Sequence, residues 1–132
     1  TFAFNSMEPF VEDFPEENSY KSILPGRPRT AGMKSGFVTV KPGESCGEHT
    51  TGRHEELLVV LEGDGRLVLP EKKYLEIRGG QAVYVPPETF HDVRNMGVTP
   101  LKYVYVVAPV TTGTEATQAR TGEGEEGMRG GG

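Results

Sequence analysis

From Gly36 onward, short apolar runs alternate with turn-forming residues. The runs hold four to seven residues, many of them β-branched, aromatic or leucine: Phe37–Val40, Leu57–Leu61, Arg66–Leu69, Tyr74–Ile77, Ala82–Val85 and Leu101–Val107. Glycine, proline and asparagine separate the runs. Strands of this length at such regular spacing are typical of antiparallel sandwiches and barrels. The pattern therefore predicts an all-β domain over residues 36–110, built from two antiparallel sheets.

One turn signal stands out between two of these runs. The tetrapeptide Glu62-Gly63-Asp64-Gly65 separates Leu57–Leu61 from Arg66–Leu69. Gly and Asp between apolar runs are typical of a tight hairpin turn. The sequence thus predicts that these two runs pair with each other.

Both ends of the chain differ from the body. Residues 1–35 contain prolines that disfavour a helix, and their spaced phenylalanines predict a partly extended arm that docks on the body: Phe2, Phe4, Phe10 and Phe14. Residues 111–132 hold seven of the 18 glycines and no aliphatic or aromatic side chain of the Val, Ile, Leu, Phe, Tyr or Trp type. Such a segment has too few apolar groups to offset its ordering entropy. It is predicted to be a flexible Gly/Glu-rich tail that adds nothing to the core.

Composition and charge limit the classes of binding partner and the cellular location that we expect for the protein. The net charge is −5. A surface that binds nucleic acid needs clustered basic residues, and the sequence shows no such cluster. The longest aliphatic run, Leu57–Leu61, is far shorter than the roughly 20 residues of a membrane span. No basic segment followed by an apolar one opens the chain, and Cys46 has no cysteine to pair with. We therefore expect a cytoplasmic protein that binds neither nucleic acid nor membrane.

The three histidines lie among the predicted strands. They are His49, His54 and His91, and neutral imidazole is the commonest metal ligand in proteins. Side chains two apart share one face of a strand, so His54 and Glu56 point the same way and Glu55 points away. A loop after His49 can then bring His49, His54 and Glu56 to one point. A mixed nitrogen and oxygen set suits one divalent transition metal such as Fe, Mn, Ni, Co or Zn, whereas three unrelated histidines are the alternative.

The glycines and prolines around these histidines follow a more specific spacing. Residues 42–63 read PGESCGEHTTGRHEELLVVLEG and residues 80–95 read GQAVYVPPETFHDVRN. Together they resemble the two motifs of the cupin superfamily, and eight positions match in order. The matching positions are Gly43, His49, Glu56 and Gly63 in the first motif, and Gly80, Pro86, His91 and Asn95 in the second.

Two residues depart from the cupin pattern. Thr51 stands where the first motif has its second histidine, and Glu88 stands where the second motif has a glycine. The resemblance implies a site of three histidines and one glutamate, and this chain supplies two of those histidines on pattern. Three outcomes stay open. His54 fills the vacant position, as we predict, or the site keeps three protein ligands and more water, or the metal site is lost.

The resemblance also implies a fold and an active site. The fold is a double-stranded β-helix, a jelly-roll barrel with its ligand site inside. On the last predicted strand Lys102 should face solvent, so Tyr103 and Tyr105 should point inward. Either phenol is a candidate catalytic group that contacts a substrate or a metal-bound water. Plain core packing is the alternative.

Functions of similar proteins leave the reaction open. The first hypothesis is a metal-dependent small-molecule enzyme of the dioxygenase, decarboxylase, isomerase or lyase kind. The second is a non-catalytic barrel that binds a sugar or other small molecule as a sensor, and Thr51 favours it. In either case the apolar stripe of Leu57, Val59 and Leu61 and the N-terminal arm predict a homodimer.

Overall fold

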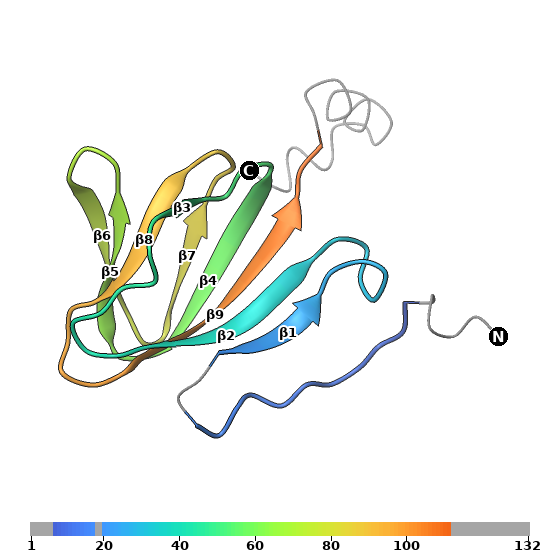
Figure 1. The fold of residues 1–132 in the computed structure, drawn as a ribbon, viewed down its shortest axis with the longest axis horizontal. Helices are drawn as coiled ribbons and strands as arrows, with labels where there is room; N and C mark the ends of the chain where they lie inside the picture. Colours follow the sequence, from blue (N-terminus) through green and yellow to red (C-terminus); the bar gives the residue numbers. More distant parts are fainter. Residues whose placement is uncertain (1–6, 18–19, 112–132) are drawn as a thin grey trace.

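Strands make up the regular structure of this protein. A computed structural model describes residues 7–17 and 20–111 (Figure 1). Within these ranges there is no helix, and therefore none that could span a bilayer. The strands are β1 (Lys21–Pro25), β2 (Lys34–Val40), β3 (His49–Thr50), β4 (His54–Glu62), β5 (Asp64–Leu69), β6 (Lys73–Arg78), β7 (Gln81–Val85), β8 (Phe90–Asn95) and β9 (Leu101–Pro109).

The strands form two sheets, and every pairing within them is antiparallel. One sheet has the order β1-β2-β9-β4-β7 and the other has the order β3-β8-β5-β6. The sheets face each other and spread apart at one end (Figure 1). The predicted all-β architecture of two antiparallel sheets is confirmed, and each predicted run lies within a strand.

The predicted hairpin at Glu62-Gly63-Asp64-Gly65 is wrong. β4 pairs with β7 and β9, whereas β5 pairs with β6 and β8, so the turn carries the chain from one sheet to the other. Gly63 has φ +94°, and a Cβ there would lie 2.6 Å from the carbonyl oxygen of Pro100. The Gly-rich signal marks a tight corner between sheets, and local turn chemistry does not tell the two apart.

Part of the predicted arm joins a sheet. β1 lies within residues 1–35 and pairs with β2. The ring of Phe14 packs on Phe37 of β2 at 5.0 Å between centroids, and Arg29 lies 4.2 Å over the ring of Phe10. Phe14 thus packs on the body, whereas Phe10 contacts a residue within the arm itself. Phe2, Phe4 and the predicted tail beyond Thr111 lie outside the described residues.

Inward side chains of both sheets build one core. The larger sheet contributes side chains such as Leu58, Val60 and Leu101, and the smaller sheet contributes Leu67 and Val93. Leu58, Val60, Leu67, Val93 and Leu101 are each at most 1% exposed. Strict alternation along β4 produces this burial, because every second residue faces the opposite sheet.

Asn95 holds the turn between β8 and β9 through its side chain. Its side-chain amide donates to the carbonyl oxygens of Val40 and Thr99 at 2.8 Å, and its Oδ1 accepts from the amide of Gly97. The residue is 2% exposed. This motif position therefore holds the β8–β9 turn against β2.

Candidate metal centre

A cavity of about 590 Å³ lies between the two sheets. Its walls carry apolar side chains, and a group of polar ones gathers at one side. The polar and ionisable residues that line it include Lys34, Cys46, His49, Thr51, His54, Glu56, His91, Tyr103 and Tyr105. Its volume is in the range of small-molecule sites, which are mostly apolar with a few convergent polar groups.

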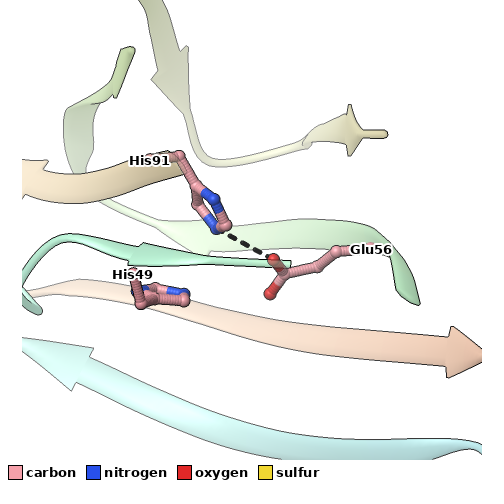
Figure 2. A group of neighbouring side chains, drawn as sticks. All are labelled: His49, Glu56 and His91. Carbon is pink, nitrogen blue, oxygen red and sulfur yellow. Dashed lines mark ion pairs between the residues drawn. The ribbon is translucent and has the colours of Figure 1, made fainter. Parts of the chain in front are cut away.

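Three of the predicted ligands meet in this cavity. Ligand atoms of His49, Glu56 and His91 lie within 4.8 Å of one another (Figure 2). His49 and His91 are register partners on β3 and β8, and their ring centroids are 4.3 Å apart. Glu56 reaches them from β4 in the other sheet. The packing of one sheet on the other therefore brings the group together.

Backbone carbonyls fix the orientation of both imidazoles. Nδ1 of His91 lies 3.0 Å from the carbonyl oxygen of Thr89, and Nδ1 of His49 lies 3.0 Å from that of Gly47. A carbonyl oxygen only accepts, so each Nδ1 carries the hydrogen. The Nε2 atoms are thereby directed toward the shared point, which is the arrangement usual for metal-binding histidines.

His91 and Glu56 form a buried pair across the two sheets. Nε2 of His91 lies 2.9 Å from Oε1 of Glu56, and the side chains are 1% and 7% exposed. Burial opposes the charged imidazolium, but the hydrogen bonds to Glu56 and Thr89 outweigh it, and the pKa of His91 is raised. A proton thus bridges the pair where a cation would otherwise lie between them.

The donor set fits a divalent transition metal. Two imidazole nitrogens and a carboxylate oxygen suit Fe, Mn, Ni, Co or Zn. Neighbouring ligand atoms at bond lengths of about 2.1 Å lie roughly 3 Å apart around an octahedral ion, and the His91–Glu56 pair is close to this spacing. The buried carboxylate and imidazole are therefore already placed for a common cation.

His54 lies on the same face of β4 as Glu56 but outside this group. Both line the cavity, as the two-residue spacing predicts, and Glu55 points away to accept a 2.8 Å hydrogen bond from the hydroxyl of Tyr84. Among the described residues, the ligand atoms that cluster belong to His49, Glu56 and His91, without His54. The role of His54 as a fourth ligand stays a prediction.

Thr51 has a structural task at its motif position. Its hydroxyl donates to the carbonyl oxygen of Pro86 at 2.8 Å and accepts from the amide of Thr89 at 3.0 Å. The residue is 8% exposed. It therefore ties the loop before β4 to the loop before β8, which carries His91. The sequence pattern showed the missing histidine but gave no sign of this link.

Glu88 shows why a glycine is usual at its position. Its φ is +55°, in the left-handed region that costs a residue with a Cβ. The amide of Glu88 donates to the carbonyl oxygen of Gly52 at 2.8 Å, which holds the turn in place. The chain thus keeps the turn geometry without the glycine.

Tyr103 and Tyr105 both face the cavity, as the alternation along the last strand predicts. The hydroxyl of Tyr103 lies 3.0 Å from Sγ of Cys46, and that of Tyr105 lies 2.8 Å from the hydroxyl of Tyr20. Burial is the main cause that raises the pKa of each phenol far above its ordinary value. Both phenols therefore stay protonated at neutral pH.

The place of Tyr105 depends on Gly36 across the sheet. A Cβ on Gly36 would lie 2.7 Å from the Tyr105 ring. The tyrosine lies against the bare backbone of β2 there. Tyr20 and Cys46, the polar partners of the two phenols, were missed as site residues, because the sequence does not show which loops face β9.

Comparisons with known proteins identify a family. The family model for the Cupin domain matches residues 36–107. The protein SchB of Streptomyces halstedii is 30% identical over 102 residues, which are 75% of this chain and 73% of SchB. A Cupin 2 conserved barrel domain protein from Salinispora arenicola superposes with a TM-score of 0.62 at 23% identity, over 80% of this chain and 92% of that one.

Another relative is much longer than this chain. Mannose-1-phosphate guanylyltransferase RfbM of Salmonella typhimurium is 33% identical over 69 residues, which are 52% of this chain. The match spans 14% of RfbM. The likeness therefore concerns a small part of a longer protein.

We predict that Thr51→Val destabilises the protein. The substitution keeps the shape but leaves the Pro86 carbonyl and the Thr89 amide without their partner, at a cost of about 1–3 kcal/mol. Thr39→Val is the matched control, because the buried hydroxyl of Thr39 has no hydrogen-bond partner among the described residues. Denaturant unfolding should show a loss for Thr51→Val and none for Thr39→Val. Equal effects would contradict the structural role of Thr51.

Proposed function

The chain belongs to the Cupin domain family, and we propose that it is a metal-dependent enzyme acting on a small oxygen-bearing molecule inside the barrel. The observation that supports this most is the meeting of His49, Glu56 and His91 at the wall of the 590 Å³ cavity. A buried carboxylate and a buried imidazole are costly for a fold that makes no use of them.

The proposed site holds one divalent transition metal through His49, Glu56 and His91. When bound, such an ion polarises a carbonyl or enolate oxygen of a substrate, or activates oxygen. Two of the proposed ligands are buried and His49 is exposed. Glu56 and His91 would therefore hold the ion from the inside of the barrel, and His49 would hold it from the exposed side.

In this proposal, the other residues that line the cavity bind and orient the substrate. The apolar side chains of Val38, Leu58 and Val93 exclude water from the walls. Tyr103 and Tyr105 keep their protons, so each can donate a hydrogen bond to a substrate oxygen that gains negative charge. We infer that these donors favour a reaction in which negative charge develops on a substrate oxygen.

Metal retention tests the ligand set. We expect His91→Ala to lose its metal, as measured by elemental mass spectrometry on the purified protein, because a buried ligand nitrogen disappears. Glu55→Gln is the matched control, since this neighbouring carboxylate faces away from the cavity toward Tyr84. Metal in His91→Ala at the wild-type level would contradict the site.

Metal affinity, measured by chelator competition, decides the fourth ligand. A loss of affinity in His54→Ala would add His54 to the set, as the sequence predicts. An unchanged affinity would leave three protein ligands.

Turnover separates the enzyme from a binding protein. Metal-loaded protein is incubated with a panel of small hydroxy acids, keto acids and enols, and conversion is followed by proton NMR. We expect Tyr103→Phe to lower kcat about 100-fold with metal retained, since loss of one hydrogen-bond donor to a developing oxyanion costs about 10²–10³-fold. Compounds that raise the melting temperature of the protein but are not converted to product would contradict the enzyme proposal. They would favour the non-catalytic sensor.

A second copy of the chain is the proposed partner of the outer face of the larger sheet. Leu57 and Tyr84 are cross-strand neighbours there and are 41% and 57% exposed. Val59 and Val104 continue the apolar strip. Charged groups flank the strip: Glu55 lies at one end, and Lys102 and Glu62 pair at 3.9 Å at the other. The strip thus suits an isologous dimer.

Solution mass measured by light scattering tests this dimer. We expect twice the chain mass for the wild-type protein and the single-chain mass for Leu57→Glu, because a buried charge opposes association. Val98→Glu is the matched control, since Val98 is 92% exposed and lies in the turn before β9. A monomeric wild-type protein would refute the proposal.

A further inference from the structure

The segment that leads into β3 runs alongside β8 and contains one residue more than the part of β8 that it faces. Ser45 forms a bridge with Arg94, and His49 pairs with His91. Four residue steps separate Ser45 from His49, but three separate Arg94 from His91. One residue of the segment is therefore left without a ladder partner, as in a β-bulge.

Gly47 lies in this bulge, and Asp92 supplies the partner that it lacks. The amide of Cys46 still donates to the carbonyl oxygen of Val93 at 3.0 Å, but the amide of Gly47 donates to Oδ1 of Asp92 at 2.9 Å. The side chain of Asp92 thus replaces a backbone carbonyl. Gly47 itself has φ +102°, which suits a bulge residue.

The carbonyl of the same glycine orients His49. Its oxygen lies 3.0 Å from Nδ1 of His49, which donates to it. Gly47 is therefore held on its amide side by Asp92 and holds His49 on its carbonyl side. His49 is the exposed member of the proposed ligand set, so it depends on this link more than the buried His91 does.

We propose that Asp92 is a positioning residue for the metal site, acting on His49 through Gly47. Asp92 lies on the side of β8 opposite to His91, so it does not touch the metal position itself. Its carboxylate is mostly buried, and Arg94 approaches the other oxygen at 3.8 Å. The inference rests on the proposed metal site. It adds a residue that orients the ligand His49 without being a ligand itself.

Zn²⁺ affinity, measured by chelator competition on the full chain, tests this role. We expect Asp92→Ala to weaken binding about 10–100-fold, the usual range for lost partners of ligand histidines. Asp92→Asn keeps an acceptor oxygen and should bind within about threefold of wild type. Arg94→Ala is the matched control and should leave the affinity unchanged, because the Gly47 link stays intact.

A double-mutant cycle separates positioning from general damage. If Asp92 acts through His49, Asp92→Ala should add little to the loss already caused by His49→Ala. An equal further loss in the His49→Ala background would overturn the proposal, as would an unchanged affinity in Asp92→Ala. Gly47→Ala is a second variant that disturbs the link without touching Asp92, and it should behave in the same way.

The tautomer of His49 gives a readout that needs no metal. Side-chain nitrogen NMR of the metal-free protein at alkaline pH should show the hydrogen on Nδ1 in wild type and a mixture of tautomers in Asp92→Ala. The same tautomer populations in both proteins would overturn the positioning role. A wild-type protein that binds no Zn²⁺ would instead overturn the proposed function, and the NMR result would still decide the link from Asp92 to His49.

Discussion

His91 and Glu56 meet between two sheets, 2.9 Å apart and almost fully buried. Ionisable groups at such depth need a partner, since either one alone would carry a large desolvation cost. The partner comes from the opposite sheet, so the pair exists only when β4 and β8 face each other. Cavity, ligand convergence and the inward tyrosines of β9 all depend on that packing. The corner at Gly63 helps to make it, because the chain changes sheets there.

The sequence predicted the parts of this arrangement that repeat with a fixed period. Alternation along β4 and β9 placed Glu56, Tyr103 and Tyr105 on inward faces, and the motif spacing brought His49 and His91 into the same set. Parity also placed His54 on the cavity side. It fixes only the face of a strand, however, and not the distance across the space between two sheets, so it could not show that His54 stands apart from the group.

Other features depended on relations that no local pattern contains. The signal at Gly63 is the same for a hairpin and for a corner between sheets. The task of Thr51 requires knowing that its loop lies against the loop of Pro86 and Thr89. Asp92 has its role because the segment before β3 has one residue more than the part of β8 that it faces. Such a bulge can be recognised only when the pairing of both segments is known. These features arise from the pairing of distant segments.

The exposed position of His49 has a kinetic consequence. Glu56 and His91 belong to long strands packed in the core, whereas His49 lies on the two-residue strand β3 at the end of an exposed loop. Short, solvated segments open with much lower free energy than the core around them. The segment that carries His49 is therefore expected to open at a lower free-energy cost than the strands that carry Glu56 and His91.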